Sequence, residues 1–224
     1  MIVEKPPWVR HEEDSAIYSV DAHPDGTRFA TGGGDNKVKI WPTGALFKDG
    51  PPTMPSAADA PNRASDALSY AAVSPLAVLH EHEGRVEGVR WSHSGAYLAS
   101  ASDDTYLFLW ELRPGAASSV PFGSTDEPNT ENWTRVFMLH GHNMDVMDCA
   151  WSPDDSYLAS GSLDNKVLVW QIPTPDGRVS GASAILRPLR ILQGHENFVK
   201  GVTWDPVGRY LASAGEDNRL LVWR

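Results

Sequence analysis

The stretch VMDCAWSPDDSYLASGSLDNKVLVW, residues 146–170, is the clearest copy of the pattern that decides the fold. It begins with an apolar run, turns at Ser152-Pro153-Asp154-Asp155, and passes a patch of small residues at Ala159-Ser160-Gly161. It ends in alternating apolar residues before Trp170. Period-2 alternation is typical of strands, and Pro, Asp and Gly between short apolar runs are typical of tight turns. The stretch therefore predicts three short antiparallel strands.

Three other stretches align with this one without a gap: residues 17–41, 86–110 and 199–223. A fourth apolar run precedes each of the later copies, at Leu76–Leu79, Arg135–Leu139 and Leu189–Leu192. Each of these runs is followed by a histidine four residues before the copy begins: His82, His142 and His195. A fixed repeat of this kind indicates a protein built by stacking one supersecondary unit.

The pattern resembles the WD-repeat family, whose unit is a four-stranded blade of a β-propeller. The resemblance implies an all-β fold in which a buried histidine, serine or threonine, aspartate and tryptophan brace each blade through hydrogen bonds. The implied sets are His82, Ser100, Asp104 and Trp110; His142, Ser160, Asp164 and Trp170; and His195, Ser213, Asp217 and Trp223. The first copy offers Thr31, Asp35 and Trp41, with His11 displaced by two extra residues.

The spacing between copies predicts one propeller segment over 1–224, with repeats at 10–41, 76–110, 135–170 and 189–223. Residues 42–75 are rich in Pro and Ala and poor in large apolar groups, so we expect a disordered insert there. Shorter loops are expected at about 115–132 and 173–184.

The amino-acid sequence in and around the repeats is similar to that of the HIRA family of histone chaperones. The similar segments include Lys5-Pro6-Pro7-Trp8-Val9, Phe29-Ala30-Thr31-Gly32-Gly33, Ala150-Trp151-Ser152-Pro153 and Val199-Lys200-Gly201. This resemblance implies a nuclear, non-catalytic scaffold in replication-independent nucleosome assembly and transcriptional regulation, including repression. Its partners would be chaperone subunits and, directly or indirectly, histones. The alternative is the WD-repeat subunit of chromatin assembly factor, which shares stretches such as Glu131-Asn132-Trp133-Thr134.

HIRA-type propellers have seven blades, so four repeats imply an incomplete ring. Residues Met1–Val9 are expected to act as an outer strand in the full ring.

The amino-acid composition limits the classes of partner that this chain is expected to bind. The chain has 29 acidic and 19 basic residues, a formal charge of −10, which argues against binding phosphate backbones or anionic lipid. We therefore expect no sequence-specific nucleic-acid binding and no membrane association. Cys149 is the one cysteine, so no disulfide can form within the chain.

Several clusters look like reactive sites when taken singly. Gly32-Gly33-Gly34 lacks the Lys-Ser/Thr of a phosphate loop and aligns with the hairpin of the other repeats. His80 and His82 alternate along a strand end and so point to different faces, which disfavours a metal site. No catalytic constellation remains once the repeat residues are assigned, so neither catalysis nor a cofactor or metal is expected.

Loops carried on a rigid scaffold are the usual binding elements. The hairpin and the loop entering the first strand of each blade should share one face. The partner-binding candidates there are Arg85, Asp103, Asp145, Leu163, Phe198 and Glu216, with Gly34 in the first blade. An exposed Leu163 or Phe198 would be a better anchor than the charges. Separately, Trp110-Glu111-Leu112-Arg113 resembles the box that docks WD propellers onto cullin ubiquitin ligases, which leaves a substrate receptor as another alternative.

Overall fold

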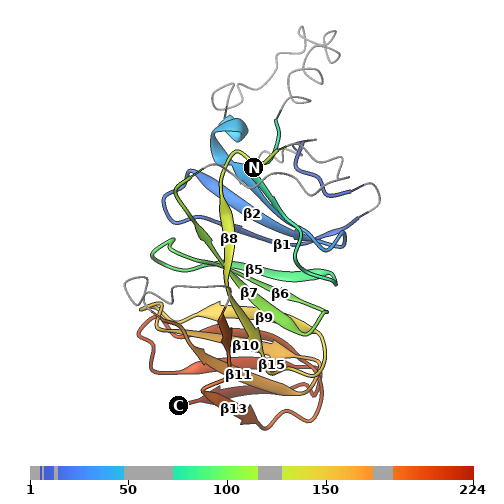
Figure 1. Ribbon diagram of the computed structural model, residues 1–224. Coiled ribbons are helices and arrows are strands. Elements are labelled where there is room, and N and C mark those ends of the chain that lie inside the picture. Colours follow the sequence, from blue (N-terminus) through green and yellow to red (C-terminus); the bar gives the residue numbers. More distant parts are fainter. Residues whose placement is uncertain (1–5, 7, 13–14, 48–72, 116–127, 174–183) are drawn as a thin grey trace, which may run out of the picture.

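The computed structural model describes residues 6, 8–12, 15–47, 73–115, 128–173 and 184–224. In these residues, four β-sheets lie one after another through the molecule, in the order of the sequence (Figure 1). Neighbouring sheets pack through their innermost strands and through the side chains between them. This is the blade arrangement of a β-propeller, which confirms the all-β prediction.

The strands of the four blades have the following bounds. Blade one contains β1 (Ile17–Ala22), β2 (Arg28–Gly33), β3 (Val38–Pro42) and β4 (Ala77–Leu79). Blade two contains β5 (Val86–Trp91), β6 (Leu98–Ser102), β7 (Tyr106–Leu112), β8 (Trp133–His140) and β12 (Ala184–Leu186). Blade three contains β9 (Val146–Trp151), β10 (Tyr157–Ser162), β11 (Lys166–Gln171) and β13 (Arg190–Gln193). Blade four contains β14 (Val199–Trp204), β15 (Leu211–Gly215) and β16 (Leu220–Trp223).

The repeat in the sequence and the blade in space are offset by one strand. The apolar run that precedes each later copy pairs with the third strand of the copy before it: β4 with β3, β8 with β7, and β13 with β11. The chain therefore completes one sheet before it enters the next, and each connection ties two neighbouring blades together.

The tight turns recur at the same positions with the same left-handed backbone conformation. The turn between the first two strands has a positive φ at Gly26, Gly95, Asp155 and Gly208. The next hairpin has a positive φ at Asn36, Thr105, Asn165 and Asn218. Glycine and asparagine tolerate this conformation, whereas the β-branched Thr105, at φ 76°, does not do so readily.

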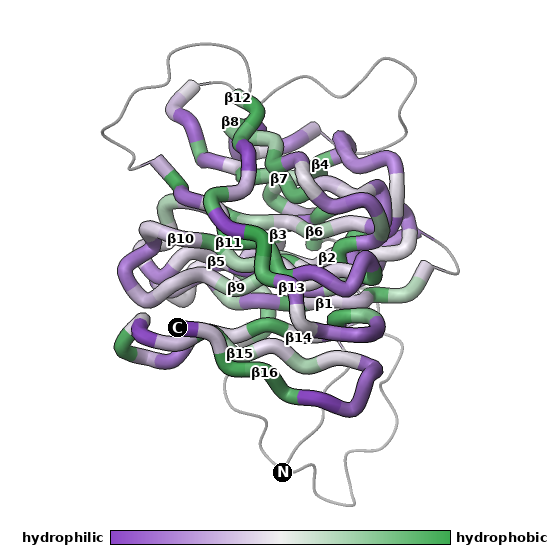
Figure 2. Tube along the Cα trace, turned by 90° about the horizontal axis from the view of Figure 1, so that it is seen from below, coloured by the Kyte–Doolittle hydropathy of each residue, from purple (hydrophilic) through white to green (hydrophobic). Residues whose placement is uncertain are grey.

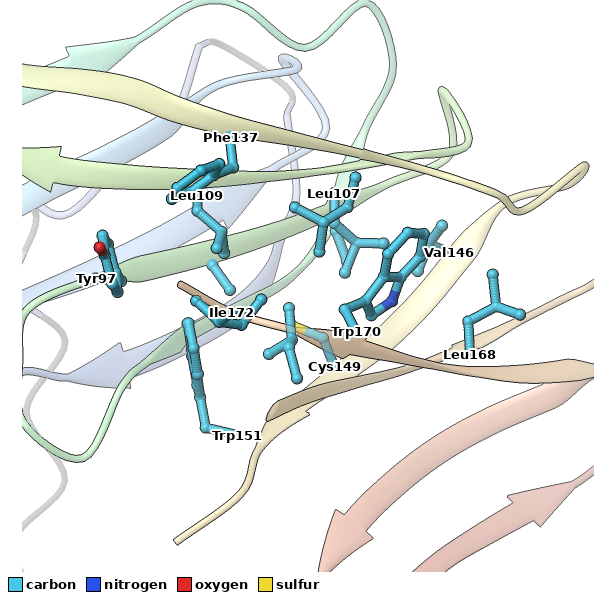
Figure 3. Packing of buried hydrophobic residues seen from close by; sticks show 14 residues of the cluster. Tyr97, Leu107, Leu109, Phe137, Val146, Cys149, Trp151, Leu168, Trp170 and Ile172 are labelled. Atoms are coloured by element: carbon cyan, nitrogen blue, oxygen red, sulfur yellow. The ribbon is translucent and has the colours of Figure 1, made fainter. Parts of the chain in front are cut away.

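The core lies between the sheets. Figure 3 shows the cluster between blades two and three, where Ile172 lies among Tyr97, Leu109 and Trp151. Three tryptophans at the ends of the first strands of blades two to four join neighbouring blades by hydrogen bonds. Each donates its indole N–H to a carbonyl on the innermost strand of the preceding blade: Trp91 to Asp21 at 3.3 Å, Trp151 to Arg90 at 3.0 Å and Trp204 to Ala150 at 3.1 Å.

The outer edges of the first two blades are covered by connecting segments. Thr130 and Glu131 donate their backbone N–H groups to Leu76 O, and the Asn129 side chain bonds the N–H and the C=O of Val78 in β4. In blade two, β12 pairs in parallel with β8. Covering an edge in this way hides backbone groups that would otherwise pair with another chain.

These connections correct part of the loop prediction. Within the insert expected at 42–75, residues Thr43–Phe47 form the 3₁₀ helix η1, and Ala45 is buried beneath Trp8. Residues 48–72 of that prediction lie outside the described residues. Residues 129–131, expected as loop, lie along β4, and Ala184 already begins β12. The remaining loop predictions at 116–127 and 174–183 also lie outside the described residues.

The role expected of Met1–Val9 in a full ring stays a prediction, because its partner blade would be the last one of that ring. Residues 1–5 and 7 lie outside the described residues, and Pro6, Trp8 and Val9 are not in a strand. Trp8 packs against Phe29 and Trp41 of blade one, with ring centroids 6.2 and 5.8 Å apart. No helix in the described part of the chain is long and apolar enough to span a membrane.

Candidate functional site

Each blade contains a buried set of four side chains joined by hydrogen bonds: a histidine, a serine or threonine, an aspartate and a tryptophan. We call this set the tetrad of the blade, and describe it first for blade two. His82 precedes β5, Ser100 lies in β6, Asp104 lies in the β6–β7 hairpin and Trp110 lies in β7. The Trp110 indole N–H donates to Ser100 Oγ at 2.9 Å, and Ser100 Oγ lies 2.7 Å from His82 Nε2. His82 Nδ1 lies 2.7 Å from Asp104 Oδ2. Ser100 and Trp110 are at most 1% exposed.

The chemistry of these groups fixes the direction of the bonds. An ionised carboxylate can only accept, so the imidazole Nδ1–H donates to Asp104. In the neutral imidazole the other nitrogen then accepts, and the Ser100 hydroxyl donates to His82 Nε2. The indole N–H of Trp110, which can only donate, donates to the Ser100 hydroxyl oxygen. The hydrogen bonds therefore run from tryptophan to serine to histidine to aspartate, and each of these buried polar groups has a partner.

The other three blades repeat this geometry. The structure brings together His142, Ser160, Asp164 and Trp170, and also His195, Ser213, Asp217 and Trp223, each joined at 2.8–3.1 Å. In blade one, Thr31 replaces the serine and accepts from Trp41 at 2.9 Å. His11 still reaches both Thr31, at 2.9 Å, and Asp35, at 2.5 Å, despite the two extra residues before β1.

The aspartate of each set also holds the backbone. Asp104 accepts from the N–H of Glu83 at 3.1 Å and of Tyr106 at 3.0 Å, so that it joins the loop after the histidine to the hairpin. Burial raises the pKa of Asp104, but its hydrogen bond and charge interaction with His82 outweigh this and hold that pKa below its usual value. The same balance lowers the pKa of Asp35 to about 2. These carboxylates therefore stay ionised, and they hold the loop after the histidine to the hairpin.

The braced loops share one face of the propeller. In every blade, the residue before the tetrad aspartate donates its backbone N–H to the residue that precedes the first strand. The pairs are Asp103 to Arg85 at 3.1 Å, Leu163 to Asp145 at 3.0 Å, Glu216 to Phe198 at 2.8 Å, and Gly34 to Ala16 at 2.9 Å. The partner-binding candidates thus lie side by side in pairs, one pair per blade. We call this row of loops the loop face.

The exposure of the loop face differs from what the sequence led us to expect. Leu163 and Phe198, the expected apolar anchors, are only half-buried and not exposed. The Lys200 ammonium lies 5.7 Å from the centre of the Phe198 ring and 3.2 Å from Glu216. The exposed apolar residue is instead Met144, 43% exposed, in the loop between His142 and Asp145. The sequence pattern does not distinguish Met144 from the other residues of its loop, because the equivalent positions in blades two and four are Gly84 and Asn197.

An acidic group lies on the loop face between blades two and three. Burial raises the pKa of Glu87, and the neighbouring charges of Asp103 and Asp145 raise it further against the opposing charges of Arg85 and Lys200. Burial and Asp145 likewise raise the pKa of Asp103. Carboxylates that raise one another's pKa bind a proton or a cationic group more readily than isolated ones.

The remaining sequence clusters have structural roles. A Cβ at Gly32 would collide with Val86, and one at Gly33 would collide with the His11 ring, so these glycines allow close packing within and between blades. His82 is committed to its tetrad. Arg113 of the ligase-type box is 51% exposed and pairs with Glu111 of the same box at 3.1 Å.

Comparisons with known proteins agree with this architecture. The model of the CAF1B/HIR1 β-propeller domain matches residues 1–224. The chain is 40% identical over its whole length to the protein HIR1 of Mycosarcoma maydis and 35% identical to hir1 of Schizosaccharomyces pombe. It is 46% identical over 77% of its length to the protein HIRA of Oryza sativa subsp. japonica. It spans 20%, 22% and 16% of these relatives, respectively. The chain belongs to the CAF1B/HIR1 β-propeller family and is a WD-repeat propeller of the HIRA type.

Proposed function

We propose that this chain is the non-catalytic scaffold segment of a nuclear HIRA-type histone chaperone complex that acts in replication-independent nucleosome assembly and transcriptional regulation. The single observation that carries the proposal is the similarity to HIR1 and HIRA proteins along the whole chain. The buried tetrads support a scaffold role, because their His, Ser and Asp groups are all used in bracing.

The loop face is the proposed partner surface. Its loops are braced by backbone hydrogen bonds, it presents an exposed methionine at Met144, and it carries the carboxylates of Glu87, Asp103 and Asp145. Braced loops, an unbranched apolar side chain and negative charge suit a protein partner with a basic surface, such as a histone or a chaperone subunit that carries one.

The test is purification of the tagged full-length protein from nuclear extract, followed by immunoblotting for histones and chaperone subunits. We expect both to be recovered. Met144→Asp should lower their recovery at least about tenfold, because it places a charge at the apolar anchor of a binding surface. Leu112→Asp is the matched control, since Leu112 is 39% exposed at the end of β7 and outside the loop face.

Recovery of neither histones nor chaperone subunits would refute the proposed function. Equal recovery with Met144→Asp and Leu112→Asp would leave the scaffold role standing and would remove the loop face as the partner surface.

A further inference from the structure

The innermost strands of neighbouring blades lie next to one another: β1 beside β5, β5 beside β9 and β9 beside β14 (Figure 2). Each of these strands stands at the end of its own sheet, so one of its edges carries backbone groups that no strand of that sheet pairs. Buried backbone N–H groups need an acceptor, which can come here from the side chains of the neighbouring blade. Polar side chains at this inner edge can therefore join one blade to the next.

One such bond occurs at two of the three junctions between blades. Between blades one and two, the Val89 N–H donates to Ser19 Oγ at 3.1 Å. Between blades three and four, the Val202 N–H donates to Asp148 Oδ2 at 3.2 Å. Ser19 and Asp148 are both the third residue of their strands, and Val89 and Val202 are both the fourth. The acceptor side chain of one blade thus covers the same backbone N–H of the next blade.

The junction between blades two and three uses an arginine instead. The third residue of β5 is Gly88, which has no side chain to accept a bond, and Arg90 of the same strand reaches across to blade three. Its Nη2 lies 2.9 Å from Asp148 Oδ1, which forms an ion pair. Its Nη1 donates to Ser19 Oγ at 2.9 Å and to the Val89 carbonyl at 2.8 Å. Arg90 therefore contacts the acceptor side chains of both other junctions.

The chemistry of the guanidinium suits this position. It has two terminal nitrogens in one plane, and here each nitrogen serves a different neighbouring blade. Burial raises the pKa of Asp148, and the charge of Arg90 and the Val202 N–H oppose that rise. The Asp148 side chain is 18% exposed and that of Arg90 is 36% exposed, so water screens this attraction only in part. Arg90 thus favours the ionised carboxylate that accepts the bond from blade four.

We propose that Ser19, Arg90 and Asp148 form a relay along the innermost strands that couples the four blades, so that a change at Ser19 in blade one alters the Val202 amide in blade four. Arg90 is the positioning residue of the relay, since it acts by orienting Asp148 and holding its charge.

The relay and the tetrads have different tasks. Each tetrad joins the strands and loops within one blade, whereas the relay acts between blades. β5 and β9 begin at the loop face, directly after Arg85 and Asp145, so holding these strands together also fixes the spacing of those loops. The relay is a property of the fold, and it stands or falls independently of the proposed function.

Native-state hydrogen exchange of the purified chain, read at single amides by NMR, tests the relay. Ser19→Ala removes its blade-one end without touching blade four, and the Val202 amide should exchange at least about threefold faster. Arg90→Met removes the guanidinium but keeps an unbranched side chain, and should accelerate the same amide at least about tenfold. Arg90→Lys keeps the charge but offers a single nitrogen, so its effect should lie between that of Arg90→Met and none.

Two controls separate the relay from a general loss of stability. Arg135→Met removes another arginine of blade two, whose side chain is 25% exposed and pairs with Glu81 at 3.0 Å on the outer strand β8. It should leave the exchange of the Val202 amide unchanged. The amides of β15 that bond within blade four should keep their exchange rates in every variant, because the relay does not reach them.

An unchanged Val202 amide in Ser19→Ala or in Arg90→Met would overturn the proposal. Equal acceleration by Arg135→Met, or of the β15 amides, would overturn it as well, since the variants would then only lower the overall stability. If Arg90→Met does not fold, Asp148→Asn decides the matter, because it removes the charge and keeps the size of the side chain. In that background Ser19→Ala should add less than about twofold at Val202, and fully additive effects would show that the blades respond independently.

Discussion

The bracing role of the tetrads can be tested by removing one buried hydroxyl. Ser160 is 0% exposed, accepts the Trp170 indole N–H at 2.9 Å and lies 2.8 Å from His142 Nε2. Ser160→Ala leaves both of these groups buried without a partner. An unsatisfied buried polar group costs about 1–3 kcal/mol, so two of them should lower the free energy of unfolding by about 2–6 kcal/mol.

Urea denaturation followed by tryptophan fluorescence measures this loss. Ser160→Thr is the matched rescue, because Thr31 makes the same two bonds at 2.9 Å in blade one, and it should cost clearly less than Ser160→Ala. Ser94→Ala, at an exposed turn, should change the stability by less than about 0.5 kcal/mol. A loss below about 1 kcal/mol for Ser160→Ala, or equal losses for Ala and Thr, would refute the reasoning.

Three further predictions concern other parts of the fold. Thr105→Asn should stabilise the chain by about 0.5 kcal/mol in the same denaturation assay, because Thr105 has φ 76° where the other blades have asparagine; a lower stability would count against it. The pKa of Asp35 is lowered from 3.8 to about 2, so its stabilisation is present above pH 4 and is lost as the pH falls toward 2. The melting temperature should fall over that range, and Asp35→Asn should show a shallower fall than the unsubstituted chain; equal slopes would contradict the assignment. Burial raises the pKa of Cys149 to about 12, so a thiol reagent at pH 8 should label it only after unfolding, and rapid labelling of the folded chain would contradict its position.

Features that recur in every blade could be predicted from the sequence, whereas features found in one blade could not. Strand alternation, turn residues and the His, Ser, Asp and Trp positions recur at fixed spacing, so four copies reinforce one another. The position of His11 shows how far this extends. Two extra residues obscured its alignment, yet its ring contacts the aspartate and the hydroxyl of its blade as the other three histidines do.

Features that depend on neighbouring blades left little trace in the sequence. The cover on β4 by residues 129–131 and the parallel strand β12 come from segments with loop-like composition, and pairing with a neighbouring blade orders them. The half-burial of Phe198 was also missed, since its apolar character alone favours exposure and burial equally in a loop. The loop face could be predicted as a location, whereas its exposed residue Met144 could not be separated from its neighbours by pattern alone.

The proposed function of this propeller is that of a scaffold in a replication-independent histone chaperone complex. The most direct measurement is histone deposition onto a closed plasmid, read as supercoiling, by the purified full-length complex in the absence of DNA synthesis. We expect supercoiling by the complex that contains the unsubstituted propeller and its loss with Met144→Asp, while Leu112→Asp retains it. Supercoiling that occurs only during DNA synthesis, or none at all from a complex that still contains its subunits, would contradict the proposed function.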